Sequence, residues 1–156
     1  MKNDLELYDL NAECWWNENA KIYALNHLNQ PRFSFFDRYV NQWQGLNVLD
    51  VGCGGGFSCE FMARRGAIVS GIDQSQKCIK KAQEHANDNY FAIDYTYGFA
   101  ENLPYESRSF DAVICVDVLE HVADVNKVIA EIHRVLKFGG VFFSIQLTKI
   151  LNLNLL

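Results

Sequence analysis

The sequence predicts an α/β fold of the Rossmann-like, doubly wound class, in which helices cover both faces of a mainly parallel sheet. Beyond residue 45, segments of strand character alternate with segments of helical character, and this is the pattern of successive βαβ units. Nearly continuous apolar runs at residues 113–116 and 141–143 are typical of strands buried on both sides. A glycine-rich turn follows the first expected strand, where α/β folds often bind a ligand.

Turn residues delimit the expected elements. Gly66 ends the first helix of the alternating region, and Gly139-Gly140 mark the turn before the last strand, because glycine adopts the backbone conformations that helix ends and tight turns need. The expected elements are, in order, strand 47–51, helix 58–65, strand 67–72, helix 76–87, strands 90–97 and 110–116, helix 125–136 and strand 141–146.

The N-terminal residues 4–44 have helical character with polar interruptions and contain all three tryptophans. Pro31 is expected to open a helix that extends to Val40, since proline is tolerated in a first helical turn. Phe33, Phe36 and Val40 fall on one face of it, a stripe that indicates packing. We therefore expect three parts: an N-terminal helical cap (1–45), a Rossmann-like ligand-binding core (46–147) and a short tail (148–156).

Composition excludes several classes of protein. The chain has 156 residues, of which 49% are hydrophobic, as expected for one globular domain. Its net charge of -5 and lack of basic runs argue against nucleic acid as a partner. The N-terminus lacks a signal-peptide layout and no apolar run reaches membrane-spanning length, so we expect a cytoplasmic protein, with peripheral contact with a membrane left open. Five cysteines without a C-x-x-C pair indicate reduced thiols.

The glycine-rich turn is the most informative motif. Residues 50–56 read DVGCGGG, and glycines there let a ligand approach bare backbone. Asp73 stands about 20 residues after Gly52, at the end of the second strand, where a carboxylate can hold two ribose hydroxyls. The spacing is Gly-x-Gly-x-Gly, and Phe57 occupies the last glycine position of the dinucleotide pattern. This spacing suits a nucleoside ligand without a pyrophosphate, S-adenosylmethionine (SAM).

Four separate segments are expected to meet at one edge of the sheet. Gly52, Asp73, residues 99–101 and residues 116–117 each follow the carboxyl end of an expected strand. Open α/β sheets bind their ligands outside these ends, at the switch point beside the first strand. The sequence therefore predicts a single ligand site there.

With these motifs the chain resembles the class I SAM-dependent methyltransferases over about residues 48–145. The matching stretches are VLDVGCGGGF, GIDQS, GFAENLPYESRSFDAVICVDVLEHV and HRVLKFGG. More narrowly, it is similar to the O-methyltransferases of ubiquinone biosynthesis, whose hallmarks are a Trp-Trp pair, an L-x-x-L-N-x-x-R stretch and a later His-Ala. Here these are Trp15-Trp16, residues 25–32 and His85-Ala86. The resemblance implies a small phenol or quinol as methyl acceptor, such as a ubiquinone precursor.

The resemblance also implies roles for residues of the first two strands. Gly52 and Gly54 would lie against the methionine part of SAM. Asp73 would bind the ribose hydroxyls, and Asp50 would help to hold the amino-acid end of the cofactor through the turn.

Further roles follow for residues outside these strands. By resemblance, Arg32 would bind the SAM carboxylate from the N-terminal helix, although a surface salt bridge explains this arginine equally well. Val116 would offer backbone beside the sulfonium. Related enzymes often have an aspartate at the position of Phe99, so adenine is expected to rest on backbone near Ala100 and on stacking, while Glu101 is either a ligand or a surface acid.

Two kinds of chemistry are open at the segment after the fourth strand. If this segment is helical, Asp117, Glu120 and His121 share one face and could hold Mg²⁺, as an acid-x-x-Glu-His pattern does by resemblance. Alternatively, the Glu-His pair orders the loop, or His121 acts as the general base. A phenol with a pKa of about 10 is mostly protonated at pH 7, so a base or a metal has to lower the barrier to loss of its proton. The other histidines, His27, His85 and His133, fall on expected helices and are expected to be structural.

The end of the chain limits the functional prediction. Class I methyltransferases, by resemblance, continue after the fifth strand with a helix and an antiparallel strand pair, and residues 148–156 are too few to form them. We therefore expect five strands, an exposed edge at the last one and self-association through that edge. Two classes stay open: a small-molecule O-methyltransferase, and a SAM-binding module that lacks turnover or is completed by a partner.

Overall fold

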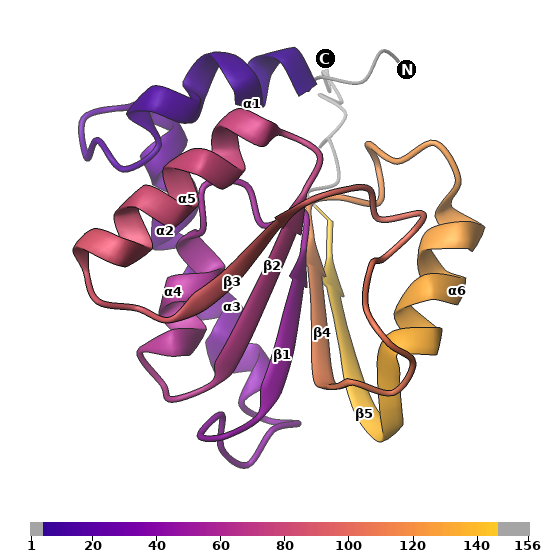
Figure 1. Cartoon of the computed structure of the whole chain (residues 1–156). Helices are drawn as coiled ribbons and strands as arrows, with labels where there is room; N and C mark the ends of the chain where they lie inside the picture. Colours follow the sequence, from indigo (N-terminus) through magenta and orange to yellow (C-terminus); the bar gives the residue numbers. More distant parts are fainter. Residues whose placement is uncertain (1–4, 147–156) are drawn as a thin grey trace, which may run out of the picture.

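The computed structural model describes residues 5–146 of the chain and has a single sheet with helices on both faces (Figure 1). All strand pairs are parallel, and the order across the sheet is β3-β2-β1-β4-β5. The strands are β1 (Asn47–Val51), β2 (Ile68–Asp73), β3 (Ile93–Tyr97), β4 (Phe110–Val116) and β5 (Leu136–Ile145). The predicted α/β class and its five strands are confirmed.

Three helices connect the strands. α4 (Phe57–Ala63) follows β1, α5 (Gln76–Asp88) follows β2, and α6 (Val125–Val135) precedes β5. The side chain of Ser75 accepts a hydrogen bond from the Cys78 N–H, and that of Asp124 accepts one from the Lys127 N–H, so both α5 and α6 begin at a capping residue. Within residues 5–146, none of the helices is long and apolar enough to cross a membrane.

The described part of the expected cap, residues 5–45, forms short helices that pack on the core. They are α1 (Leu5–Asn11), the 3₁₀ turns η1 (Ala12–Cys14) and η2 (Lys21–Tyr23), α2 (Ala24–His27) and α3 (Asn29–Phe36). α1 lies beside α5 near the carboxyl ends of the strands (Figure 1). The helix predicted to reach Val40 ends at Phe36, and residues 37–39 form a turn. The predicted packing stripe is nevertheless buried.

The last strand differs from its prediction. We expected it to begin after Gly139-Gly140, but β5 begins at Leu136 and contains both glycines. Gly139 has a φ of 75°, and the pairing with β4 shifts register between Phe110 and Ala112. The glycines therefore mark an irregularity within the strand, where glycine tolerates the left-handed backbone.

Two apolar layers flank the sheet because successive side chains of a strand point to opposite faces. The layer on the side of α3, α4 and α5 includes Phe33, Phe36, Val48, Met62, Val69, Ile114 and Phe143. The layer on the side of α6 includes Leu49, Val51, Val113, Val128, Ile132 and Val135. α3 thus belongs to the main core, although it precedes the first strand.

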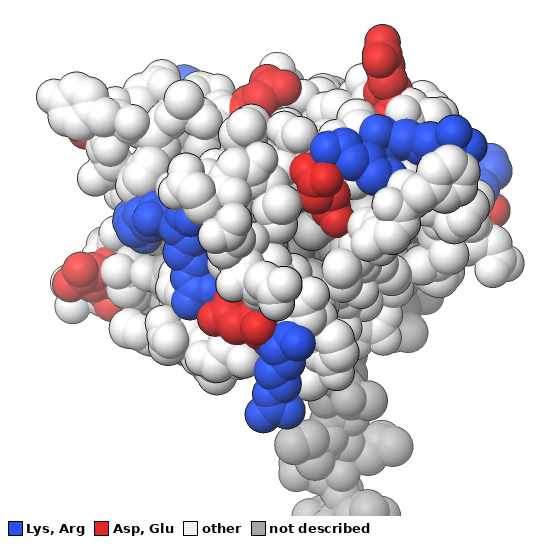
Figure 2. Space-filling model, turned by 90° about the horizontal axis from the view of Figure 1, so that it is seen from below, with Lys and Arg blue, Asp and Glu red and all other residues white. Residues whose placement is uncertain are grey.

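The surface at the amino ends of the strands carries basic and acidic side chains close to one another (Figure 2). Segments at this end contribute the ion pairs Arg65–Asp37 and Lys137–Asp111, each with a nitrogen–oxygen distance of 2.8 Å. Neighbouring charges of opposite sign weaken each other's field at a distance.

The contact between α3 and β5 predicts a large effect on stability. Phe36 is 1% exposed and stacks on Phe143 with ring centroids 4.3 Å apart. We expect Phe36→Ala to lower the free energy of unfolding by about 3–5 kcal/mol because it leaves a cavity. Phe35→Ala is the matched control, because Phe35 lies on the same helix and is 45% exposed. Equal losses in a denaturant titration of both variants would contradict this packing.

Candidate functional site

A solvent-connected pocket lies at the carboxyl ends of the strands, where the sequence predicts the ligand site. Residues that end β1, β2 and β4, together with residues of the cap, form its wall. All residues predicted to bind the cofactor, and the predicted base, line it: Arg32, Asp50, Gly52, Gly54, Asp73, Ala100, Val116 and His121. The tertiary structure therefore brings together segments that are far apart in the sequence.

The glycine turn after β1 has no room for side chains. Gly52 and Gly54 have φ values of 75° and 52°, a region that other residues adopt only with strain. A Cβ atom on Gly52 would lie 2.2 Å from a methyl carbon of Val118, and one on Gly54 would lie 2.5 Å from the indole of Trp15. Both glycines are therefore required by backbone conformation and by close packing.

Asp73 ties the end of β2 to this turn. One carboxylate oxygen accepts the N–H of Gly54 and the other accepts the N–H of Ser75, each at 2.8 Å. Burial raises the pKa of Asp73, and the two backbone hydrogen bonds partly oppose this shift. A carboxylate offers about four acceptor positions, so Asp73 can accept further hydrogen bonds from the pocket.

Asp50 is a buried acid in the floor of the pocket. It is 4% exposed and accepts a hydrogen bond from the Cys59 thiol at 3.4 Å. Burial raises its pKa to about 7, the Cys59 hydrogen bond and the charge of Arg32 lower it, and the charge of Asp73 raises it. A cation bound nearby would favour the ionised form of Asp50.

Arg32 and Asp117 form an ion pair within the pocket. Arg32 lies on α3, and Asp117 is the first residue after β4. Their side chains are only 12% and 17% exposed. Arg32 does form a salt bridge, which was one of its two expected roles. The salt bridge lies in the wall of the pocket, however, and not on the open surface. The pair places one positive and one negative group side by side in the pocket wall.

The helical face predicted for Asp117, Glu120 and His121 was wrong. Residues 117–121 form a bend and a turn, and Asp117 has a φ of 57°, which does not fit a right-handed helix. Glu120 is exposed and does not line the pocket. In the described part of the chain, no three His, Cys, Asp or Glu side chains are grouped so that they could hold a metal ion. The structure thus offers no support for the Mg²⁺ site.

His121 faces the pocket from this turn. Its backbone N–H donates to the Val118 carbonyl at 2.8 Å, and its ring meets the Tyr8 ring edge to face with centroids 6.0 Å apart. His27, His85 and His133 lie on α2, α5 and α6, as predicted. Only the position of His121 suits a base that acts on a ligand in this pocket.

Glu101 and Phe99 lie on the loop after β3. Glu101 lines the pocket and accepts the N–H of Ala123 at 3.0 Å, so it connects this loop to the segment before α6. Phe99 is 50% exposed and meets Tyr97 edge to face. Glu101 is therefore positioned both to order the rim and to contact a ligand.

Apart from Arg32, the sequence interpretation missed the contribution of the cap to the pocket. Tyr8, Trp15, Leu25 and Asn29 all line it. The indole nitrogen of Trp15 and the amide nitrogen of Asn29 are buried and have no hydrogen-bond partner among the described residues, while the Asn29 side-chain oxygen accepts from the Ser58 hydroxyl at 3.1 Å. The Trp-Trp pair and the L-x-x-L-N-x-x-R stretch were the available signals, because both lie in this segment.

Curated relatives of this chain are ubiquinone biosynthesis O-methyltransferases. That of Bartonella quintana is 36% identical over 95% of this chain and 64% of its own length. That of Chromobacterium violaceum is 41% identical over 90% of this chain and 61% of its own length. The chain thus spans less than two thirds of the length of these relatives.

A solved structure supports the fold, and a match to a protein-family model assigns the chain to a family. The PH0226 protein from Pyrococcus horikoshii superposes with a TM-score of 0.73, covers 82% of this chain and 59% of its own chain, and is 29% identical. The family model described as a methyltransferase domain matches residues 49–144, which contain β2, β3, β4, α4, α5 and α6 and most of β1 and β5. The chain therefore belongs to the methyltransferase domain family.

Proposed function

We propose that this chain binds SAM in the pocket at the carboxyl ends of the strands and contributes to an O-methyltransferase that acts on a small phenol or quinol. One observation carries the proposal: the glycine turn, the ribose-binding candidate Asp73 and the Arg32–Asp117 pair all line one pocket. The names of the curated relatives favour a ubiquinone precursor as acceptor.

The residues present fit SAM. Gly52 and Gly54 present backbone to the pocket that they line, where the amino-acid part of a nucleoside ligand would lie, and Asp73 keeps acceptor positions for ribose hydroxyls. Asp50 would gain its charge beside the α-ammonium group, because a nearby cation lowers the pKa of a carboxyl. Arg32 would bind the carboxylate, for which guanidinium has a matching geometry.

SAM supplies a methyl group on a sulfonium, and the protein has to align the acceptor and remove its proton. His121 is the candidate base for the phenolic hydroxyl, since it lines the pocket and a ring nitrogen of imidazole can accept a proton. The edge contact with Tyr8 restricts the orientation of its ring. Orientation of the two reactants is expected to supply much of the acceleration.

A second candidate is a SAM-binding module that needs further residues for turnover. The wall of the pocket is formed by residues between Tyr8 and Val122, and among them His121 is our single candidate for chemistry on the acceptor. The two functions differ in one measurement: both predict SAM binding, but only the first predicts methyl transfer by this chain. A cytoplasmic location and self-association through the edge strand stay predictions.

Removal of the Asp73 carboxylate should weaken SAM binding. We expect Asp73→Ala to cost about 2–3 kcal/mol of binding free energy, the range for hydrogen bonds to a charged group. Asp94→Ala is the control, since Asp94 is an exposed residue of the adjacent strand β3. Calorimetry that finds equal SAM affinity in both variants and the wild type would remove the ribose role from Asp73.

Burial of Asp50 should make the protein less stable as the pH rises. Because its pKa is raised to about 7, the folded state binds more protons than the unfolded state between about pH 4 and pH 7, and the free energy of unfolding falls with increasing pH there. Asp50→Asn should remove this dependence and stabilise the unliganded protein at pH 8 by an amount on the order of a few kcal/mol. The same variant should bind SAM more weakly, because it cannot become an anion.

Thermal and denaturant unfolding at pH 5 and pH 8 measure the Asp50 effect. A variant whose pH dependence matches the wild type would show that Asp50 is ionised in the folded protein. The affinity of Asp50→Asn for SAM is measured separately, at one pH at which the variant and the wild type are both folded.

Loss of His121 should reduce turnover and leave SAM binding intact. If His121 is the base, His121→Ala lowers the maximal rate on a demethylated quinol by about 10²–10⁴, whereas His133→Ala, an exposed change on α6, has little effect. A parallel loss of SAM affinity would assign His121 a structural role. Activity that disappears with a chelator and returns with Mg²⁺ would favour the metal instead.

A further inference from the structure

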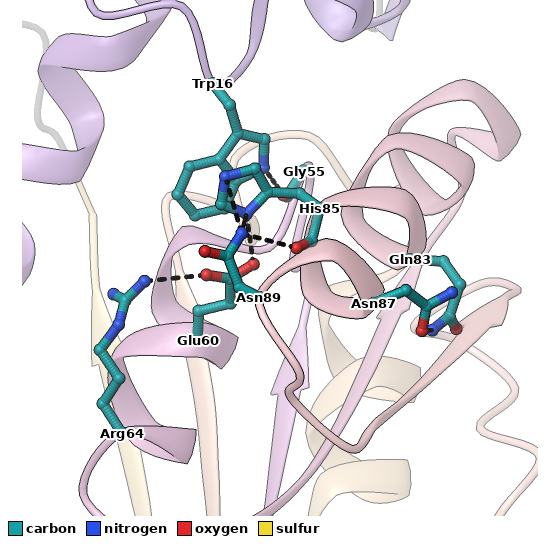
Figure 3. A network of polar contacts seen from close by, with 8 residues as sticks. All are labelled: Trp16, Gly55, Glu60, Arg64, Gln83, His85, Asn87 and Asn89. Carbon is teal, nitrogen blue, oxygen red and sulfur yellow. Dashed lines mark hydrogen bonds and ion pairs between the residues drawn. The ribbon is translucent and has the colours of Figure 1, made fainter.

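Trp16 of the Trp-Trp pair and His85 of the His-Ala motif do not line the pocket, and they meet in one contact. The ring of Trp16 lies parallel to the ring of His85, with centroids 3.5 Å apart and an interplanar angle of 2° (Figure 3). The indole N–H of Trp16 also donates to the Gly55 carbonyl at 2.9 Å. Trp16 therefore joins the cap to α5 and to the glycine turn at the same time.

A buried carboxylate holds His85 in this orientation. Glu60 on α4 is 0% exposed, and its two oxygens contact the His85 Nδ1 at 2.6 Å and the Arg64 guanidinium at 2.9 Å (Figure 3). A buried carboxylate is costly unless it is paired and hydrogen-bonded. The need to satisfy Glu60 thus fixes the imidazole plane on which Trp16 rests.

The neighbouring residue, Trp15, connects the Trp16–His85 contact to the pocket. Trp15 is 4% exposed and lines the pocket, and a Cβ atom on Gly55 would lie 2.3 Å from its indole. Trp16 thus donates a hydrogen bond to the carbonyl of Gly55, the same glycine that packs against Trp15. Displacement of Trp16 from His85 would therefore move Trp15 away from the glycine turn.

Other polar contacts also join the cap to α5. At the start of α5, the Ser75 hydroxyl donates to the Asp9 carboxylate and the Cys78 thiol donates to the Tyr8 carbonyl at 3.7 Å, but neither reaches the glycine turn. The two ion pairs are weaker anchors. The Lys81–Glu13 pair, at 3.1 Å, has a glutamate that is 83% exposed, and Lys77–Asp9 is longer, at 3.9 Å. Exposed ion pairs contribute little because water and salt screen them. The stacked and hydrogen-bonded Trp16 is the better candidate to control cap position.

We propose that Trp16 and His85 form a clasp that holds the cap closed over the pocket, and that they are positioning residues which set the rate at which the nucleoside leaves. This inference rests on the proposed binding of SAM. Trp15 forms part of the pocket wall, so a bound ligand loses this contact when the cap moves, and a weaker clasp raises the dissociation rate. Association from the open state should change much less.

The test uses S-adenosylhomocysteine, the demethylated product of SAM, as the probe in stopped-flow binding. Trp16→Leu removes both the stack and the N–H, and leaves Glu60 paired with His85 and Arg64. We expect its dissociation rate to rise about tenfold, from the loss of one ring stack and one hydrogen bond. Trp16→Phe keeps a ring on His85 and should restore part of the retention. Gln83→Ala is the matched control, because Gln83 lies on the same helix and donates to the Asn87 side chain at 3.0 Å, away from the Trp16–His85 contact (Figure 3).

A second measurement separates this inference from the proposed function. Hydrogen exchange of the unliganded protein should be faster in residues 12–28 of Trp16→Leu and His85→Ala than in the wild type or Gln83→Ala. Unchanged exchange and unchanged dissociation in both variants would overturn the clasp. A wild-type protein that binds no S-adenosylhomocysteine would instead refute the proposed function, while the exchange result would still decide whether Trp16 and His85 hold the cap.

Discussion

The pocket depends on the glycine turn after β1, in which only backbone atoms fit. Gly52 packs under Val118 and Gly54 under Trp15, so the loop after β4 and the cap can approach the end of β1 only because both positions lack a Cβ atom. Asp73 then accepts the Gly54 N–H and fixes the turn against β2. Three segments are thereby held at one point, and the pocket is the space that they leave between them.

Electrostatics in this pocket oppose the stability of the unliganded protein. Asp50 and Asp73 are buried acids whose pKa values are raised mainly by burial, and Arg32 is already paired with Asp117. Such an arrangement costs free energy in the absence of a ligand, and it complements one that carries both a positive centre and a carboxylate. Functional sites are commonly the places where a protein gives up stability in this way.

The cap forms part of the pocket wall. It provides Arg32 and Asn29 from α3 and Trp15 from the segment after η1, while Phe33 and Phe36 anchor α3 in the main core. α3 is therefore fixed more firmly than the segment that precedes it. If the clasp acts as proposed, opening would involve the first turns of the chain and leave α3 in place.

The sequence by itself determined the α/β class, the five strands, the glycine turn and the residues that line the pocket from β1, β2 and β4, because alternation, glycine spacing and strand ends are local patterns. Only the tertiary structure decided that the helix of α3 stops at Phe36, that residues 117–121 form a turn, and that Arg32 pairs with Asp117. It also decided that Trp16 rests on His85. These outcomes depend on contacts between segments far apart in the chain, and the periodicity of a single segment carries no information about which distant side chain will pack against it.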